Sequence, residues 1–294
     1  MPPELTTKTI DAALDIAFAE DFGLGDLATN TTIPENALAR AAMVSRENCI
    51  IAGIPVAQRV FERLDGNVKF GNSKNDGDAA ASGETVMTAT GRARALLTGE
   101  RVALNFIQRL SGVATLTKQF IKSSGGKVDI LHTRKTTPGL RALERHAVAV
   151  AGGKMHRFGL SDEILIKENH FALSGFSISE TVKKARAAAG EKITIGAEAR
   201  NRAEAEQAIS AGADYVLLDN YTPELLTNEI PALREMIKKT GRRVLLEASG
   251  GIRKENIHLF AGAGVDRISV GALTHSAPAI DFALDVEAVT SISI

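Results

Sequence analysis

The stretch AGADYVLLDN (residues 211–220) recurs in similar form as AGAGVDRISVG (261–271). In both, a helix-like segment ends on Ala-Gly, and an apolar strand-like run starts three or four residues later. Four more such runs precede or separate them, namely VDILHT (128–133), EILIK (163–167), ITIGAEA (193–199) and RVLLEAS (243–249). Alanine-rich amphipathic segments lie between most of the runs. This alternation predicts a parallel sheet covered by helices, either open or closed into a barrel.

Polar residues gather at or just after the carboxyl ends of these predicted strands. They are Arg134 with Lys135, Lys167, Glu198, Asp219, and Glu247 with Ser249, while the sixth strand ends at Gly271. In a (β/α) barrel the carboxyl ends converge on one face, where catalytic residues sit, whereas a doubly wound sheet concentrates function at its switch point. Any one strand end is also polar where it simply meets solvent. The set as a whole favours a barrel with a site at that face.

Two segments have the features of anion sites. Small residues follow the last two strands in EASGGI (247–252) and VGAL (270–273), where backbone N–H groups can approach a phosphate; two ordinary turns are the alternative. In RKTTPG (134–139), Thr137 is expected to cap a helix that begins at Pro138, so that free backbone donors would point toward the same place as the side chains of Arg134 and Lys135.

Cations outnumber carboxylates around this predicted face. Residues 132–170 contain seven Lys or Arg and four of the six histidines. Glu198 and Asp219 stand against them on neighbouring strands, and such a pair serves either glycoside hydrolysis or the binding of a hard cation such as Mg²⁺. Since a sugar alone would not need so many cations, the set favours Mg²⁺ bridging to a pyrophosphate.

The chain before residue 113 follows a different pattern. Short β-like runs such as AAMVSR (41–46), CIIAGIPV (49–56), NVKFGN (67–72) and ETVMTATG (84–91) lie between predicted helices at 8–22 and 95–122. We expect an α+β sandwich over residues 1–112, joined by the segment 275–294, and an α/β barrel over 113–274. Six strands are fewer than eight, so the barrel is expected to be incomplete or open. Arg101 lies on the mostly apolar second helix and needs a partner.

The composition excludes several classes of protein. Lys plus Arg and Asp plus Glu are equal at 35 each, which speaks against a nucleic-acid footprint. The one cysteine, Cys49, cannot form an internal disulfide, and no stretch approaches the length of a membrane span. The first residues lack a basic start followed by an apolar run. We therefore expect a cytoplasmic protein without a signal peptide.

Several ordered runs closely resemble the quinolinate phosphoribosyltransferase family, the decarboxylating nicotinate-nucleotide pyrophosphorylases of NAD biosynthesis. They are TRKTTPGLRALERHAV (133–148), HRFGL (156–160), LIKENH (165–170), LLDN (217–220), LEASGGI (246–252) and DRISVGALTHS (266–276). EDFGLGDLATNTTIP (20–34) and GERVALNFIQRLSGVAT (99–115) extend the resemblance over nearly the whole chain.

The resemblance implies transfer of phosphoribosyl from phosphoribosyl pyrophosphate to quinolinate, with loss of CO2, to give nicotinate mononucleotide and pyrophosphate. It assigns quinolinate to Arg134, His156, Arg157 and Lys167, with Arg101 reaching in from the partner in a homodimer or higher oligomer with shared sites. Lys135 would lie near phosphoribosyl pyrophosphate, and Glu198 and Asp219 would bind its ribose hydroxyls and Mg²⁺. These three form the implied catalytic set. The 5′-phosphate would rest on Ser249, Gly250, Gly251 and Gly271.

Four positions depart from the family pattern. Gly196 and Arg200 stand where acidic residues are expected, His132 replaces a usual aspartate, and Met155 stands where asparagine is common. They leave the details of metal binding open.

Three alternative functions remain. The molybdenum-transport-associated relatives share the fold and the phosphoribosyl site but differ in the residues that bind carboxylates. A non-catalytic anion-binding scaffold would be expected to lose Lys135, Glu198 or Asp219, all of which are present. A nicotinate-specific phosphoribosyltransferase would not require so many cations for a single carboxylate.

Overall fold

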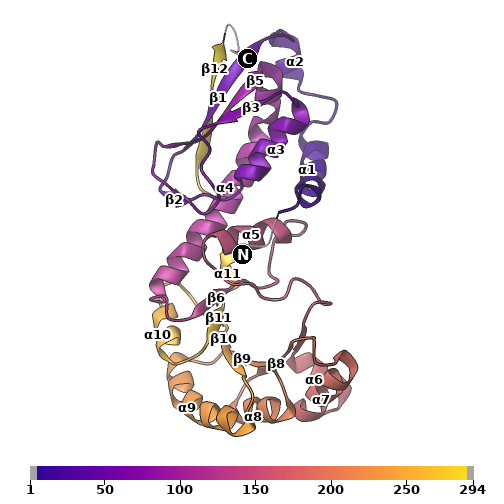
Figure 1. Cartoon of the computed structure of the whole chain (residues 1–294), viewed down its shortest axis with the longest axis vertical. Helices are drawn as coiled ribbons and strands as arrows, with labels where there is room; N and C mark the ends of the chain where they lie inside the picture. The colour runs from indigo at the N-terminus through magenta and orange to yellow at the C-terminus, as the bar shows by residue number, and fades with distance from the viewer. Residues whose placement is uncertain (1–4, 290–294) are drawn as a thin grey trace. The chain divides into compact units, whose positions relative to one another are not determined.

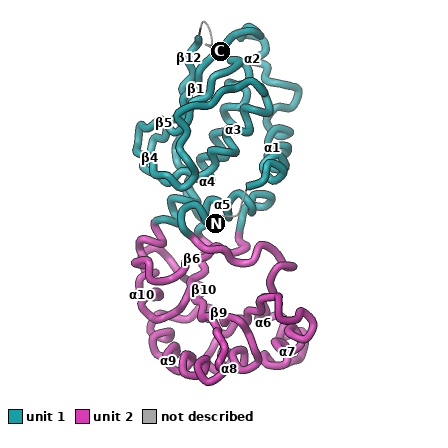
Figure 2. Tube along the Cα trace, in the orientation of Figure 1, with its two compact units in different colours: residues 1–118, 136–152, 273–294 teal, residues 119–135, 153–272 magenta. Residues whose placement is uncertain are grey.

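A computed structural model describes residues 5–289, and the chain divides into two compact units (Figure 2). Unit 1 comprises residues 1–118, 136–152 and 273–294, and unit 2 comprises 119–135 and 153–272. The segment 136–152 therefore belongs to unit 1, although in sequence it falls within the range expected for the barrel. Among the described helices, none combines the length and hydrophobicity needed to cross a bilayer.

Unit 1 is built on a four-stranded antiparallel sheet. Its order is β12 (Phe282–Val289), β1 (Leu38–Ser45), β5 (Thr85–Arg92) and β3 (Lys69–Gly71). The last strand of the chain thus pairs with β1 along its whole length, from Leu38 opposite Val289 to Ser45 opposite Phe282. A second small sheet joins β2 (Cys49–Ile50) to β4 (Ala79–Ala80).

Helices α1 (Thr7–Asp21), α3 (Ile54–Leu64) and α4 (Ala93–Ser123) lie beside the large sheet (Figure 1). The predicted face of α1 is the buried one, since Ile10, Ala13 and Leu14 are buried. The short α2 (Leu27–Thr32) has Asp26 as its N-cap, whose side chain accepts from the backbone N–H of Thr29. These caps and apolar faces account for where the helices begin and which side they bury.

The run CIIAGIPV does not form the predicted strand over its whole length. Only Cys49 and Ile50 are extended in a sheet, and α3 begins at Ile54. Gly53 has a φ of 107°, a left-handed conformation that ends the extended run. Pro55 then occupies the first turn of α3, where its missing N–H costs nothing.

Unit 2 contains six parallel strands, as predicted. Their order is β6 (Asp129–Leu131), β11 (Arg267–Ser269), β10 (Leu245–Ser249), β9 (Tyr215–Asp219), β8 (Ile195–Ala199) and β7 (Ile164–Ile166). β6 pairs only with β11 among these strands and β7 only with β8, so the barrel is open, as expected from six strands. The strands are largely buried, which explains their continuous apolar runs.

The helices of unit 2 follow the strands in sequence. They are α6 (Glu168–Ser174), α7 (Ile178–Ala189), α8 (Arg202–Ala211), α9 (Pro223–Thr240) and α10 (Ile257–Gly262). Figure 1 shows α8 and α9 on the outside of the strands between which they run. A short α11 (Ala272–His275) follows β11.

The predicted helix start at Thr137 and Pro138 is wrong. The helix α5 (Arg141–Val150) begins later and has Leu140 as its N-cap. Gly139 has a φ of 80°, which interrupts any helix from Pro138, and the N–H of Thr137 donates to Glu144 Oε2 at 3.1 Å. That N–H is therefore not a free donor for a ligand.

Candidate active site

A cavity of about 240 Å³ lies in unit 2 at the carboxyl ends of the strands. Seven of the predicted site residues line it, namely Arg134, Lys135, His156, Arg157, Lys167, Asp219 and Ser249. Thr133, Leu165, Leu217 and Ser269 complete the wall. Four Lys or Arg side chains and one histidine thus share one space with a single lining carboxylate, so the cavity is suited to an anion.

The strand register explains why these residues meet. Asp219 is the last residue of β9 and Ser249 the last of β10, and the two are directly paired. Lys167 follows the end of β7, while Arg134 and Lys135 follow β6 after a short connection. Parallel strands end on the same edge, so the spacing of polar residues in the sequence becomes a cluster in space.

Glu198 lies beside this cavity and not in its lining. It is 5% exposed, and its Oε2 accepts from Lys167 Nζ. Burial raises the pKa of Glu198 to about 7, helped by a hydrogen bond that protonated Glu198 donates to Glu168 and by the charge of Asp219, and opposed by Lys167. The same hydrogen bond lowers the pKa of Glu168, so a proton shared by these two carboxyls resides mainly on Glu198.

Asp219 is held by its neighbours on the next loop. Burial raises the pKa of Asp219, although Lys167 and Lys135 act in the opposite direction. Asn220 donates to Asp219 Oδ2 at 2.6 Å, and its own N–H donates to Ser249 O at 2.8 Å. A Cβ at Gly250 would lie 2.2 Å from Asn220 Oδ1, so glycine is required there for this contact.

His156 is surrounded by carboxylates and by a second histidine. Its Nε2 lies 3.4 Å from Glu247 Oε1, and its Nδ1 lies 3.7 Å from Glu163 Oε1. Its backbone N–H donates to His132 Nε2 at 3.3 Å. His132, the residue that replaces the usual aspartate, is fully buried and thus accepts a hydrogen bond from the backbone of the cavity wall.

The departure at Gly196 has a steric explanation. A Cβ at Gly196 would lie 2.0 Å from Tyr215 Cζ, so the ring of Tyr215 fills the space a longer side chain would need. The Tyr215 hydroxyl donates to Glu163 Oε1, and the ring stands edge-on to His156 with centroids 5.9 Å apart. The guanidinium of Arg267 lies 4.1 Å from the Tyr215 ring centroid, where cation–π attraction operates.

Glu247 lies inside the sheet and not at a strand end as predicted. It is fully buried in β10, where it accepts from Ser269 Oγ and lies 2.6 Å from Arg267 Nε. Burial alone would raise the pKa of Glu247, but His156 and Arg267 outweigh it and the pKa is lowered. Glu247 is therefore a buried charged group that supports the wall behind His156.

Other predicted residues lie outside the cavity lining. Gly250 and Gly251 follow β10, with φ of 94° and 65°, and Gly271 follows β11. Arg101 is exposed on α4 in unit 1 and forms no ion pair within residues 5–289. Arg200 is also exposed and pairs with Glu204 at 3.0 Å. Nothing in the structure explains methionine at Met155.

Sequence reasoning missed part of the wall. Ser269 was hidden within the apolar run of β11, where a lone hydroxyl was the available signal. Leu165 and Leu217 give the cavity an apolar side that strand alternation alone would have assigned to the core. An apolar side next to cations fits an aromatic ring that carries carboxylates.

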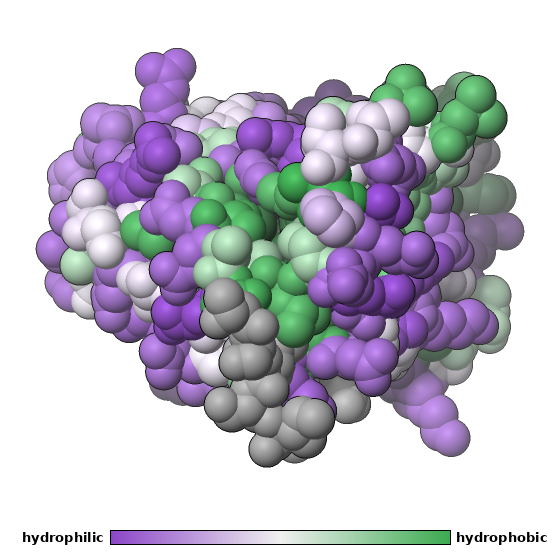
Figure 3. Space-filling model, turned by 90° about the horizontal axis from the view of Figure 1, so that it is seen from above, coloured by the Kyte–Doolittle hydropathy of each residue, from purple (hydrophilic) through white to green (hydrophobic). Residues whose placement is uncertain are grey.

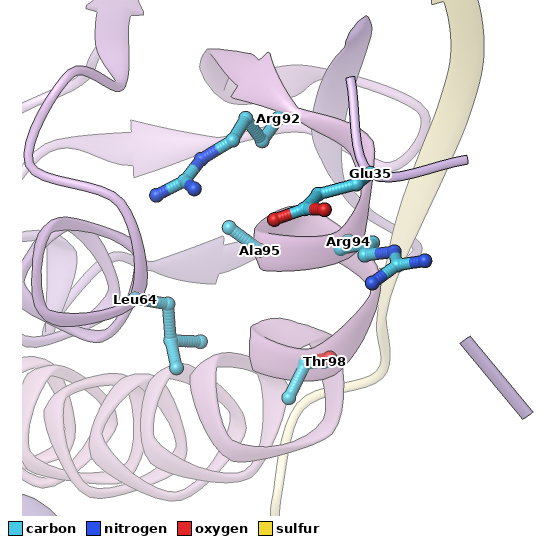
Figure 4. A pocket seen from close by; sticks show the side chains of 6 residues that line it. All are labelled: Glu35, Leu64, Arg92, Arg94, Ala95 and Thr98. Carbon is cyan, nitrogen blue, oxygen red and sulfur yellow. The ribbon is translucent and has the colours of Figure 1, made fainter. Parts of the chain in front are cut away.

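Unit 1 has a second pocket of about 250 Å³ that includes Arg92 and Arg94 (Figure 4). Its cations already have partners. Arg92 Nε lies 3.3 Å from Asp65 Oδ2, and Arg94 Nε donates to Ile33 O at 2.8 Å. Figure 4 also shows the carboxylate of Glu35 directed between the two arginines. The cations of this pocket are therefore less available to bind an anion than those of the cavity in unit 2.

Exposed apolar side chains are a separate feature of the surface. Figure 3 shows a face on which apolar side chains gather in a hollow among hydrophilic ones. In unit 1 the large exposed apolar residues are Ile16, Leu24, Leu27 and Val286. Such a surface lacks the converging polar groups that orient a small substrate.

Comparison with known proteins gives two family matches that together cover most of the chain. Residues 26–111 match the quinolinate phosphoribosyl transferase N-terminal domain, and residues 113–285 match the corresponding C-terminal domain. These ranges include every predicted site residue.

Individual relatives agree with these matches. A protein of Bacillus subtilis named as a probable nicotinate-nucleotide pyrophosphorylase (carboxylating) is 44% identical over 270 residues, which are 92% of this chain and 90% of that protein. A quinolinate phosphoribosyltransferase (decarboxylating) of Nicotiana tabacum is 35% identical, with 97% of this chain and 85% of that protein covered. The crystal structure of NadC from Streptococcus pyogenes superposes with a TM-score of 0.91 at 38% identity, covering 97% of this chain and 99% of that one. The chain belongs to the quinolinate phosphoribosyl transferase family.

Proposed function

We propose that this chain transfers the phosphoribosyl group of phosphoribosyl pyrophosphate to quinolinate, with release of CO2 and pyrophosphate, and so makes nicotinate mononucleotide in NAD biosynthesis. The observation that carries this proposal is the cavity of unit 2, where four Lys or Arg side chains and His156 surround one space. The names of the relatives, nicotinate-nucleotide pyrophosphorylase and quinolinate phosphoribosyltransferase, support the same reaction.

Quinolinate is an aromatic ring with two adjacent carboxylates. Arg134, His156, Arg157 and Lys167 supply more donors than one carboxylate can use, and the apolar side chains Leu165 and Leu217 offer a surface for the ring. Charge-assisted hydrogen bonds of about 1.5–3 kcal/mol each would hold the dianion in place. The single carboxylate of nicotinate could not use all of these donors, so their number favours quinolinate as the acceptor.

Mg²⁺ fits the two carboxylates Asp219, which lines the cavity, and Glu198, which lies beside it. Proteins bind this ion through one or two carboxylates together with substrate phosphates. Glu198 and Asp219 have raised pKa values, and Glu168 Oε2 is buried without a hydrogen-bond partner in the described part of the chain, so negative charge there is incompletely neutralised. No cluster of three or more His, Cys, Asp or Glu able to hold a metal occurs within residues 5–289. We infer that Glu198 and Asp219 hold Mg²⁺, which when bound would neutralise charge on the departing pyrophosphate.

The chemistry then requires positioning and fixed charge. The pyridine nitrogen forms a bond to the anomeric carbon as the bond from that carbon to pyrophosphate breaks. Lys135 lines the cavity and would stabilise the charge that develops on the leaving group. The ring, now cationic, accepts the electron pair of the C–C bond when the carboxylate next to the nitrogen leaves as CO2, and a proton replaces that carboxylate. The mechanism needs no covalent intermediate with the enzyme.

Arg101 enters this proposal through a second subunit. It is exposed on α4, and an isolated chain gives it no ion-pair partner among the described residues. We infer that it contacts quinolinate in the site of a partner, so that the active form is a homodimer with shared sites.

The proposal is tested by the choice of acceptor. The enzyme is supplied with phosphoribosyl pyrophosphate, Mg²⁺ and either quinolinate or nicotinate, and pyrophosphate release is measured. Release with quinolinate and none above background with nicotinate is expected. Release with nicotinate alone would show that a monocarboxylate is the substrate and would overturn the proposal.

A further inference from the structure

We propose that the half-buried Arg109 and the fully buried Glu144 form a clasp in unit 1 that positions the two chain segments leading out of the phosphoribosyl pyrophosphate site. The inference rests on the proposed function and assigns both residues a positioning role, since neither lines the cavity of unit 2. They lie on different helices, Arg109 on α4 and Glu144 on α5.

Glu144 holds the segment that follows Lys135. It is fully buried, and its Oε1 accepts from the hydroxyl of Thr137 at 2.7 Å while its Oε2 accepts from the N–H of Thr137 at 3.1 Å. The hydroxyl and the backbone N–H of Thr137 are thereby held by one carboxylate. Thr137 lies two residues after Lys135 in the chain, so its position limits where that lysine can be.

Arg109 joins this carboxylate to a second segment. Its Nε and Nη2 donate to Glu144 Oε1 at 3.0 and 2.7 Å. Its Nη1 donates to Ala277 O at 3.0 Å, and its Nη2 also donates to Thr274 O. Thr274 lies three residues after Gly271, the glycine proposed to contact the 5′-phosphate.

The pair is built as a fixed unit. A fully buried carboxylate is costly unless it is paired and its remaining lone pairs are filled, and here both oxygens have donors. The planar guanidinium provides several donors in a rigid fork, which lets one side chain hold two carbonyls and a carboxylate at once. The clasp therefore ties together the residues just beyond Lys135 and just beyond Gly271.

Loss of the clasp is expected to affect the binding of phosphoribosyl pyrophosphate more than that of quinolinate. Both tied segments carry groups proposed to bind phosphoribosyl pyrophosphate, and small displacements of such groups are expensive in catalysis. Loosening the clasp should therefore raise KM for phosphoribosyl pyrophosphate. A role confined to stability would lower the melting temperature and the amount of active enzyme, with KM unchanged.

The test compares Thr137→Val, Thr137→Ser and Arg109→Lys in the full-length protein. Thr137→Val removes the 2.7 Å hydrogen bond but keeps the side-chain volume, and Thr137→Ser restores the hydroxyl. Thr117→Val is the matched control, because Thr117 is a buried threonine of unit 1 whose hydroxyl donates to Val113 O of its own helix, at 2.8 Å. KM for each substrate, kcat and the dissociation constant of phosphoribosyl pyrophosphate by calorimetry are measured for all four.

We expect Thr137→Val and Arg109→Lys to raise KM and the dissociation constant for phosphoribosyl pyrophosphate about tenfold, with a smaller effect on KM for quinolinate. Thr137→Ser should recover most of the loss, and Thr117→Val should match the wild type. Unchanged constants in folded Thr137→Val and Arg109→Lys would overturn the inference while leaving the proposed function intact. A wild-type protein that neither binds phosphoribosyl pyrophosphate nor turns it over would instead overturn the proposed function, and this inference with it.

Discussion

The charge state of a single carboxyl, Glu198, links the structure of the cavity to pH. Its pKa is raised to about 7 by burial and by Glu168 and Asp219. If the carboxylate form binds ribose hydroxyls and Mg²⁺, kcat/KM for phosphoribosyl pyrophosphate must fall by about tenfold per pH unit below pH 7, since this constant reports groups of the free enzyme. Glu198→Gln should lower kcat/KM by about 100-fold and abolish that acidic limb. An acidic limb that persists in Glu198→Gln would assign the titration to another group.

The same shift makes a prediction for stability. A carboxyl whose pKa is higher in the folded than in the unfolded chain binds more protons when folded, so its contribution to the free energy of unfolding falls as pH rises. For Glu198 the window runs from its ordinary value of 4.5 to about 7. Urea unfolding from pH 4.5 to 7.5 should show a smaller decline in stability for Glu198→Gln than for the wild type. An identical pH dependence in both would contradict the raised pKa.

Gly196 and Tyr215 give a third prediction at the scale of residues. Since a Cβ at Gly196 would lie 2.0 Å from Tyr215 Cζ, Gly196→Ala should destabilise the protein by about 1–3 kcal/mol. The double variant with Tyr215→Val should lose less stability than the sum of the two single losses, because the two positions share one space and their effects are not additive. Urea unfolding of the two single variants and the double variant measures the coupling. Strictly additive free energies would show that the two residues do not compete for that space.

At this scale, the sequence could predict a site residue when its place at the end of a strand was enough to locate it. Lys167 and Asp219 were predictable because each stands where a strand ends, and strand ends meet on one face. The reason for glycine at position 196 was not predictable, because it depends on Tyr215, which becomes its neighbour through the pairing of β8 with β9. The role of His132 depended likewise on a backbone N–H from another segment.

At the scale of elements, α4 contains a glycine whose replacement by alanine should change the stability of the protein in the direction opposite to the one that helix propensity predicts. Replacing glycine by alanine within a helix normally stabilises by about 0.5–1 kcal/mol. At Gly112, however, the new Cβ would lie 2.0 Å from Pro278 O, in the segment that leads to β12. Gly112→Ala should therefore destabilise by about 1–3 kcal/mol.

The matched control is Gly262→Ala at the end of α10, where a Cβ would meet nothing within 4 Å. It should be neutral or stabilising in the same thermal unfolding experiment. A stabilised Gly112→Ala would show that the segment at Pro278 can move away from α4 at little cost.

Elements were predictable where a pattern ran long enough. All six parallel strands and the long helix α4 follow from apolar runs and periodicity. The runs CIIAGIPV and TTPG were misassigned because single glycines, Gly53 and Gly139, adopt left-handed conformations there. A glycine permits such a conformation without requiring it, so the sequence alone does not decide where a strand or helix stops.

At the scale of the whole molecule, the proposed shared site predicts complementation between two inactive proteins. Arg101→Ala should lose quinolinate binding while its thermal unfolding stays unchanged, because Arg101 is exposed on α4. Arg157→Ala should inactivate the cavity itself. When the two are mixed and subunits exchange, a mixed dimer has one intact site, so activity should rise to about one quarter of the wild-type value. A mixture as inactive as its components, with subunit exchange verified, would place Arg101 outside the partner's site.

The central claim is that one cationic cavity holds a dicarboxylate through both phosphoribosyl transfer and decarboxylation. The most direct measurement uses quinolinate labelled in the carboxyl next to the ring nitrogen, with phosphoribosyl pyrophosphate and Mg²⁺. Labelled CO2 and nicotinate mononucleotide should appear in equal amounts, and neither should form when phosphoribosyl pyrophosphate is omitted. Label retained in a nucleotide product, or no product from quinolinate at all, would contradict the account.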